Sequence, residues 1–182
     1  MSESSNQNFN HLKIHTQYSI CEGAIKIDKL KDFCKESKIP CLGLSDTSNL
    51  CGALEFAENI SKVGTQPIIG TQIYFKFEDT TGLLPLIALN EKGYKRIIEL
   101  SSRSYLENDA LSDPHLDVEE LLSDMEGILL FSGTIQGLFG KLFEKGRLEE
   151  INKIYRSLLS NFHDRFYLEI QRHGDQNEIA FE

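Results

Sequence analysis

Three short polar segments carry the side chains of this sequence that are best suited to binding a metal ion. They are residues 15–19, 45–49 and 171–174, with the sequences HTQYS, SDTSN and QRHG. Each follows a short apolar run that is typical of a strand, and in a βα fold the loops after the strands gather at one edge. We therefore expect His15, Asp46 and His173 to lie close together. Imidazole nitrogens and carboxylate oxygens are suitable ligands for zinc or manganese.

The same residues also have structural interpretations, and their spacing leaves the alternatives open. A histidine such as His15 after a strand is equally typical of a partly buried, hydrogen-bonded ring, and Asp46 could hold its turn or cap the next helix. Residues 133–140 are glycine-rich but lack the Lys-Ser/Thr pair of a phosphate-binding loop. No Ser-His-Asp arrangement is recognisable from the order of residues.

Strand and helix patterns alternate along the chain. The 182 residues, 40% hydrophobic and 26% charged, have the composition of one globular domain. Apolar runs predict strands at residues 11–15, 41–44, 66–77, 83–89, 127–131 and 166–171. Helical or amphipathic patterns cover residues 25–37, 53–60, 90–105, 116–125, 138–143 and 148–159, with Asn90 as a helix cap.

This alternation predicts an α/β fold with a mostly parallel sheet. An antiparallel pair is expected at residues 66–77 and 83–89, joined by a turn at 79–82. The pattern favours a barrel-like (β/α) arrangement, although a full barrel usually takes about 250 residues. We therefore expect the chain to be a fragment of a larger protein.

Charge and hydropathy exclude several classes of function. The formal net charge is −9, whereas surfaces that grip a phosphate backbone are usually basic. No apolar stretch is long enough for a membrane helix and the start does not resemble a signal peptide, so we expect a cytoplasmic protein without membrane contact. The four cysteines are expected to be reduced core thiols; they are Cys21, Cys34, Cys41 and Cys51.

Several motifs in a fixed order resemble one protein family. The runs are HLKIHTQYSICEGAIKI, IPCLGLSDTSNLCGALEFAENISKVGTQPIIGTQIYF, NEKGYKRIIELSS and FYLEIQRHG. They resemble the PHP domain that opens the alpha subunit of bacterial DNA polymerase III, over nearly all of residues 9–174. The resemblance implies a distorted (β/α)7 barrel, similar to a TIM barrel and incomplete at its C-terminal end here. Residues 1–8 would be a flexible tail and residues 9–182 a partial PHP domain.

The resemblance also implies which positions form the cleft that holds metal in the family. Four residues match the family's motifs: His11, His15, Asp46 and His173. Three others replace two histidines and a glutamate of family members with an intact site: Lys13, Thr47 and Gln72. Thr134 stands near a cysteine-like position, and the Asp-x-His motif that completes the family's site would lie beyond Glu182.

These departures predict a vestigial site, with no catalytic residue and no cofactor in this segment. The weak candidates for metal ligands that remain are His15, Asp46 and His173. We expect Lys13 to repel an entering cation and to form an ion pair with Asp46. We expect Thr47 and Gln72 to hydrogen-bond with each other or with water, which would satisfy a polar pocket without metal.

For function, the resemblance implies one part of a replicative DNA polymerase. The whole protein would transfer nucleotides with Mg²⁺, and would bind DNA mainly through regions downstream of this segment. The pattern of lost ligands is similar to that of proteobacterial alpha subunits, whose PHP domain docks a separate proofreading exonuclease, the epsilon subunit, alongside other replicase subunits. Two alternatives are a stand-alone metal-dependent phosphoesterase of the histidinol-phosphatase kind, which needs a populated metal site, and a scaffold domain unrelated to replication.

Overall fold

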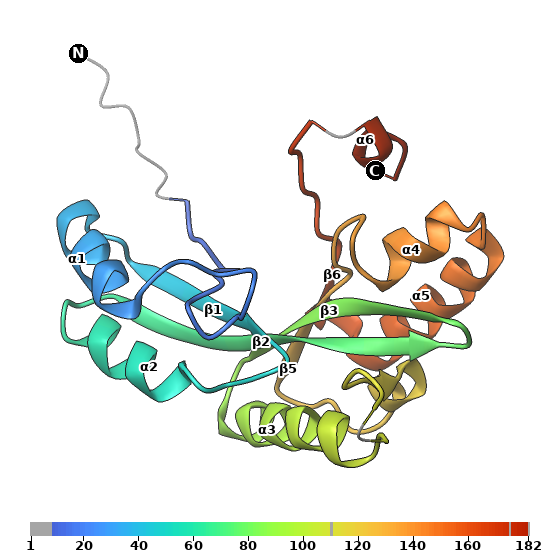
Figure 1. The fold of residues 1–182 in the computed structure, drawn as a ribbon, viewed down its shortest axis with the longest axis horizontal. Coiled ribbons are helices and arrows are strands. Elements are labelled where there is room, and N and C mark those ends of the chain that lie inside the picture. The colour runs from blue at the N-terminus through green and yellow to red at the C-terminus, as the bar shows by residue number, and fades with distance from the viewer. Residues whose placement is uncertain (1–8, 110, 175, 182) are drawn as a thin grey trace.

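The computed structural model describes residues 9–109, 111–174 and 176–181, and it has a mixed α/β fold (Figure 1). Its strands are β1 (Cys41–Thr47), β2 (Gln66–Phe77), β3 (Thr80–Ala88), β4 (Leu116–Asp117), β5 (Ile128–Phe131) and β6 (Phe166–Tyr167). Its helices are α1 (Ile27–Ser37), α2 (Ala53–Ser61), α3 (Glu91–Leu106), α4 (Leu138–Glu144), α5 (Leu148–Phe162) and α6 (Gln176–Phe181), with short 3-10 helices η1 (Val118–Leu122) and η2 (His163–Arg165). The expected N-terminal tail, residues 1–8, lies outside the described residues.

The strands form one open sheet in the order β1-β2-β3-β5-β6, with β4 beside the far end of β2. The β1–β2 and β5–β6 pairs are parallel, whereas β3 runs antiparallel to both of its neighbours. Of the described strands, β3 alone runs against the others, so the expected mostly parallel sheet and the expected antiparallel pair at β2 and β3 are both confirmed. The expected barrel is not formed, since β1 and β6 are not paired with each other and the described sheet does not close.

The first and the last of the expected strands are much shorter than predicted. In place of a strand over residues 11–15, a single parallel bridge joins Ile14 to Leu44. In place of a strand over residues 166–171, only β6 pairs with β5, and the chain then leaves the sheet. Both segments lie at edges of the open sheet, so each has a pairing partner on one side alone, which weakens the strand.

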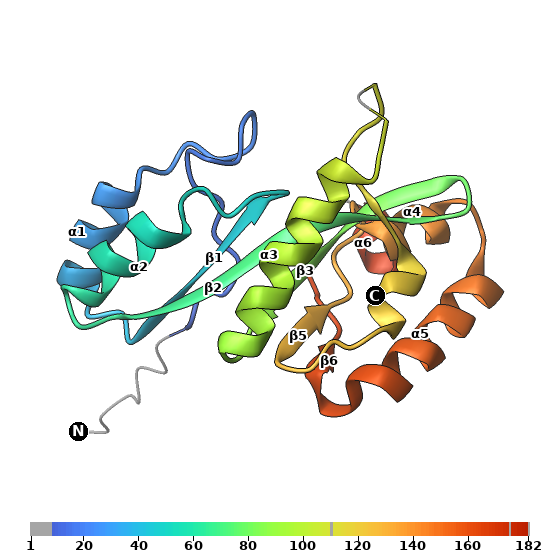
Figure 2. The same cartoon turned by 90° about the horizontal axis from the view of Figure 1, so that it is seen from below.

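Two hydrophobic clusters stabilise the sheet at its two ends. The smaller one packs α1 and α2 on β1, through buried side chains such as Leu30, Leu44 and Phe56. The larger one packs α3, α4 and α5 on the β2–β3 hairpin and β5, through residues such as Phe75 and Phe139. Figures 1 and 2 show α1 and α2 at the β1 end of the sheet and α4 and α5 at the hairpin end. The long strand β2 belongs to both parts and holds them together.

Other expectations need correction in detail. The amphipathic segment at residues 116–125 is β4 followed by the 3-10 helix η1, whose buried Val118 and Leu121 are three residues apart, as the 3-10 repeat requires.

All four cysteines are free, but only Cys34 is fully buried. Cys21 and Cys51 are exposed because both lie in turns between the elements. Of the described helices, none combines the length and apolar character that crossing a membrane requires.

Helix α3 is fixed to the strand β5 through two glycines. As expected, Asn90 caps the helix, and its Oδ1 accepts a hydrogen bond from the Gly93 backbone N–H at 2.9 Å. Gly93 lies so close to Gly127 that an added Cβ would stand 1.8 Å from the Gly127 carbonyl oxygen. This close contact brings the start of α3 against the residue that precedes β5.

We expect Gly93→Ala to reduce the free energy of unfolding by about 2 kcal/mol, because the methyl group would force the helix away from Gly127. The result would run against helix propensity, which favours alanine over glycine by about 1 kcal/mol. Urea unfolding followed by circular dichroism measures the change. Ser102→Ala, at an exposed position of the same helix, is the control and should be neutral or stabilising. A Gly93→Ala protein as stable as the control would show that the contact can relax freely.

Candidate functional site

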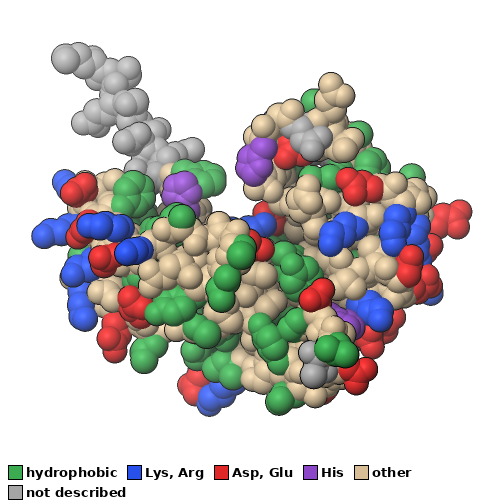
Figure 3. Space-filling view, viewed as in Figure 1, with side chains coloured by type: hydrophobic (Ala, Val, Ile, Leu, Met, Phe, Trp, Pro, Cys, Tyr) green, Lys and Arg blue, Asp and Glu red, His purple; other side chains and the backbone are tan. Residues whose placement is uncertain are grey.

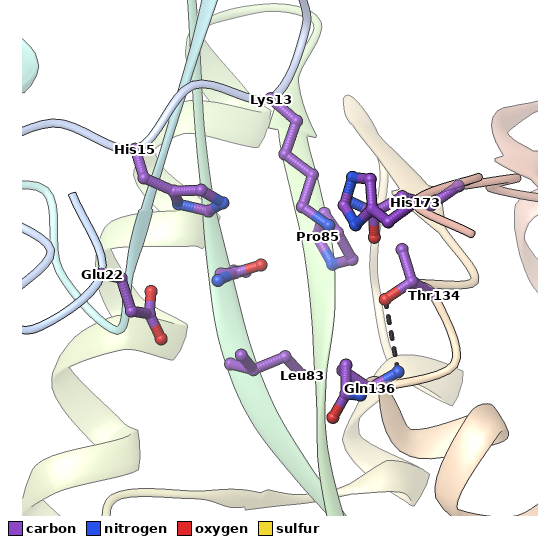
Figure 4. A pocket seen from close by; sticks show the side chains of 12 residues that line it. Lys13, His15, Glu22, Leu83, Pro85, Thr134, Gln136 and His173 are labelled. Atoms are coloured by element: carbon purple, nitrogen blue, oxygen red, sulfur yellow. Dashed lines mark hydrogen bonds between the residues drawn. The ribbon is translucent and has the colours of Figure 1, made fainter. Parts of the chain in front are cut away.

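A polar cavity of about 340 Å³ lies at the end of the sheet where β1, β5 and β6 end (Figure 4). Polar and charged side chains come from the N-terminal segment, β2 and the loops that follow β5 and β6. Its lining consists of Lys13, His15, Glu22, Gln72, Leu83, Pro85, Gly133, Thr134, Gln136, Gly137, Gln171 and His173. Five of the eight residues predicted from the sequence are among them: Lys13, His15, Gln72, Thr134 and His173.

The other three predicted residues lie outside the cavity lining. His11 is exposed, with its ring centroid 4.9 Å from that of Phe9 in an edge-on contact. Asp46 is fully buried, and the half-buried Thr47 follows it at the end of β1. The two candidate ligands His15 and His173 therefore line one cavity, as predicted, whereas the third, Asp46, is enclosed by protein.

The buried Asp46 carboxylate accepts three hydrogen bonds from the loop after the N-terminal segment. Oδ1 accepts from the Thr16 backbone N–H and from the Ser19 hydroxyl, both at 2.6 Å, and Oδ2 accepts from the Thr16 hydroxyl at 2.7 Å. A buried carboxylate needs such hydrogen-bond donors, because an interior charge without partners strongly lowers the stability of the fold. The carboxylate thus holds the N-terminal segment on β1 through neutral donors.

Lys13 pairs with Glu169, and the predicted ion pair with Asp46 is wrong. The Lys13 Nζ donates to Glu169 Oε1 at 2.8 Å, and the two side chains are 27% and 17% exposed. Asp46 already has three donors in its immediate surroundings, whereas Glu169 stands at the cavity edge where the lysine stem can reach it. Glu169 is itself positioned by the hydrogen bond from its backbone N–H to the Ser132 hydroxyl at 3.0 Å.

The predicted hydrogen bond between Thr47 and Gln72 is confirmed. The Gln72 amide Nε2 donates to the Thr47 hydroxyl oxygen at 2.7 Å, and this hydroxyl in turn donates to the carboxylate of Glu22. A single hydroxyl can act as acceptor and donor at the same time. The two consecutive hydrogen bonds, from Gln72 to Thr47 and from Thr47 to Glu22, therefore fix the side chains on one wall of the cavity.

His15 points into the cavity with an imidazole that burial makes hard to protonate (Figure 4). Burial, reinforced by the positive charge of Lys13, lowers the pKa of His15 below the ordinary value for histidine. The Nδ1 atom is buried and has no hydrogen-bond partner among the described residues. The ring is thus favoured in its neutral form, which leaves one nitrogen free to accept a proton or a hydrogen bond.

His173 and Thr134 occupy the opposite side of the cavity. The His173 side chain is 70% exposed, its Nδ1 lies 3.9 Å from Glu178 Oε1, and its backbone N–H donates to Glu178 Oε2 at 2.8 Å. Thr134 is buried, and its hydroxyl oxygen accepts from the Gln136 backbone N–H at 3.3 Å. These contacts hold the loops after β5 and β6, while Nε2 of the exposed imidazole lies 3.1 Å from Nε2 of the Gln171 amide.

Four residues that hold the surroundings of the cavity in place were not predicted from the sequence. Thr16 and Ser19 donate hydrogen bonds to Asp46. Glu22 accepts a hydrogen bond from Thr47, and Glu169 forms the ion pair with Lys13. Thr16, Ser19 and Glu169 lie inside the segments HTQYS and FYLEIQRHG, but at positions that do not match the family's metal ligands. Glu22 gave no signal, because its pairing with Thr47 depends on a turn that the pattern does not predict.

The donor set of the cavity does not match what a metal centre needs. Among the residues that the structure describes, no group of three or more His, Cys, Asp or Glu side chains is placed to hold a metal ion. Each carboxylate near the cavity already has its own hydrogen-bond or ion-pair partners. An ammonium group stands beside His15, where it would repel a divalent cation.

Comparison with known proteins identifies the family to which this mixed α/β sheet, with its polar cavity at the strand ends, belongs. A PHP domain model matches residues 11–173, and the chain belongs to the PHP domain family. It is 36% identical over 195 residues to the DNA polymerase III subunit alpha of Caulobacter vibrioides, covering 100% of this chain and 17% of that protein. It is also 36% identical over 175 residues to the same subunit of Rickettsia felis, covering 96% of this chain and 14% of that protein. The chain thus spans about a sixth of the length of these relatives.

Solved structures show a more distant likeness. An amidohydrolase from Chromobacterium violaceum is 16% identical, with a TM-score of 0.39 over 81% of this chain and 54% of that one. Similarity at this level supports no argument about chemistry.

We expect Lys13→Gln to raise the pKa of His15 while leaving it below the ordinary value, because burial is the larger cause and persists in the variant. Proton NMR titration of the imidazole measures the shift, and Lys29→Gln, on the exposed face of α1, is the control. Since the folded state binds the proton less readily than the unfolded state, stability due to neutral His15 is present above pH of about 6.5 and is lost as the pH falls below it. An unchanged titration in Lys13→Gln would show that the two charges do not interact.

Proposed function

We propose that this chain is the N-terminal PHP segment of a DNA polymerase III alpha subunit and acts as a non-catalytic part of it. The observation that carries the proposal is the match of the whole chain, at 36% identity, to 17% of the Caulobacter vibrioides subunit. The parent protein would act as a cytoplasmic DNA-directed DNA polymerase. Its magnesium-dependent nucleotidyl transfer and most of its DNA binding would belong to regions beyond this chain.

In the longer protein, further strands would complete a PHP-type barrel. The Ile14 bridge beside β1 and the short strand β6 form the two open edges of the sheet. A groove of about 380 Å³ lies between these edges, lined by Phe9, Asn10, His11, Leu12, Lys13, Phe131, Glu169, Ile170 and Gln171. Exposed apolar side chains in this groove, such as Phe9 and Ile170, would be covered when the barrel is closed.

We further propose that the cavity is a vestigial metal site, held together by hydrogen bonds and one ion pair. Asp46 has three donors, Thr47 links Gln72 to Glu22, and Lys13 provides a cation of its own. These contacts satisfy the polar groups that a bound metal would otherwise have to neutralise. Such a cavity would contribute to the stability of the domain without chemistry.

The test is the metal content and chelator response of the purified chain at neutral pH. We expect less than stoichiometric zinc or manganese by plasma mass spectrometry, and the same unfolding midpoint with and without EDTA. Asp46→Ala should lower the free energy of unfolding by about 3 kcal/mol, equally in both conditions, because it strands buried donors. Stoichiometric metal, or a metal-dependent phosphatase activity that is lost in His15→Ala, would instead support the phosphoesterase alternative.

As a partner we propose the proofreading exonuclease subunit of the replicase, with other replicase subunits bound by the parent protein. Support comes from the similarity to alpha subunits and from the lost metal ligands, which in the related proteobacterial proteins accompany docking of a separate exonuclease. The chain also has exposed apolar side chains that a partner could cover, for example Tyr105 and Leu106 at the end of α3. The acidic net charge favours a partner with a complementary basic surface.

Isothermal titration of the folded chain with the purified exonuclease subunit tests this role. We expect saturable one-to-one binding that Leu86→Asp abolishes, because a charge at this fully buried position of β3 unfolds the larger core. Circular dichroism verifies the folded state of the wild-type chain. A folded chain that shows no heat of binding and no co-elution with the exonuclease would rule out docking through this segment.

A further inference from the structure

A side-chain contact between Lys13 and Glu169 joins the two open edges of the sheet. Lys13 directly precedes Ile14, whose backbone N–H donates to the Gly43 carbonyl and whose carbonyl accepts from the Ser45 N–H. Glu169 follows β6 by two residues and is tied to the β5 side by its hydrogen bond to Ser132. The ion pair between them therefore links residues 156 positions apart in the chain and at opposite ends of the strand order.

The geometry of a sheet explains why long side chains are needed here. Both backbone groups of Ile14 face β1, so the backbone groups of the adjacent Lys13 face the open side. Two strands on either side of one vacant strand position lie about 10 Å apart. A lysine and a glutamate in contact can span such a gap, whereas backbone hydrogen bonds cannot.

The pair also separates two hollows of different character. On one side is the polar cavity, and on the other is the more apolar groove with Phe9, Leu12 and Ile170. Lys13 and Gln171 line both hollows, and Glu169 lines the groove. Because the two charged side chains are 27% and 17% exposed, they are less screened by water than an ordinary surface pair.

We propose that Lys13 and Glu169 form a clasp that fixes the separation of the two open edges of the sheet and closes the polar cavity against the groove. The ammonium group does by charge and hydrogen bonding what a metal ion would do by ligation, namely connect segments from both edges. The clasp is a property of this chain's own edges and does not depend on the polymerase or docking role. Its consequence is reciprocal coupling, since releasing either residue must loosen the opposite edge.

Residue-specific amide hydrogen exchange by NMR on the 182-residue chain tests the clasp. The probes are the Ile14 and Gly43 amides at one edge and the Ser132 and Glu169 amides at the other, all hydrogen-bonded in the structure. Lys13→Gln and Glu169→Gln each remove one charge; the first shortens the side chain by one atom, and the second keeps its length. We expect Lys13→Gln to accelerate exchange at Ser132 by about fivefold and Glu169→Gln to accelerate it at Ile14 and Gly43 by a similar factor, as for loss of a pair worth about 1 kcal/mol.

Two controls separate the clasp from general destabilisation. The Ile73 amide of the central strand β2, in the core, should exchange at the wild-type rate in both variants. Lys29→Gln removes the exposed Lys29–Asp32 pair within α1, 73% and 61% exposed, and should leave all four probes unchanged. The charge-swapped protein with Lys13→Glu and Glu169→Lys should recover most of the protection that the single variants lose.

The outcome decides between a clasp and an incidental contact. Acceleration confined to the edge that carries the mutation would overturn the proposal. Equal acceleration at Ile73 would do the same, because it would mean that the whole fold opens. A charge-swapped protein as unprotected as the single variants would show that the pairing of opposite charges is not what joins the edges.

Discussion

The buried carboxylate of Asp46 is the interaction on which the architecture of the cavity depends. A charge in the interior without a counter-ion must be matched by hydrogen-bond donors, and Thr16 and Ser19 provide them from a loop that is 27 to 30 residues away in sequence. This requirement places the N-terminal segment on β1. It thereby determines where Lys13 and His15 enter the cavity.

The remaining charges follow from that arrangement. With Asp46 satisfied by neutral donors, Lys13 is free to cross the open side of the sheet to Glu169. Its ammonium group then lies beside His15, where burial and positive charge together lower the imidazole pKa. Among the described residues no group of three or more metal-ligating side chains forms in this cavity, although its position at the strand ends is the one where α/β folds place functional residues. The fold and the chemistry of the site are therefore separable, as is common when one fold supports several roles.

The open sheet is the second constraint on the molecule. Edge strands have unpaired backbone groups on one side, so β6 and the Ile14 bridge are short. The hydrophobic clusters are centred on α1 and α2 at one end and on the hairpin at the other, and at the open edges they are contacted by Ile14 and Phe166. Side chains at the opening are consequently the ones whose surroundings would change most in a longer protein.

The sequence by itself determined most of the local structure and the family. Apolar periodicity located β1, β2, β3 and β5 and nearly all the helices, the Asn90 cap was correctly predicted, and ordered motifs identified the PHP family, because these signals lie within short stretches of chain. Only the tertiary structure decided that the sheet stays open, that its edge segments pair so little and that Glu169 is the partner of Lys13. Those features depend on contacts between segments that are far apart in the chain, such as the one between Lys13 and Glu169. The spacing of residues along the chain does not reveal such contacts.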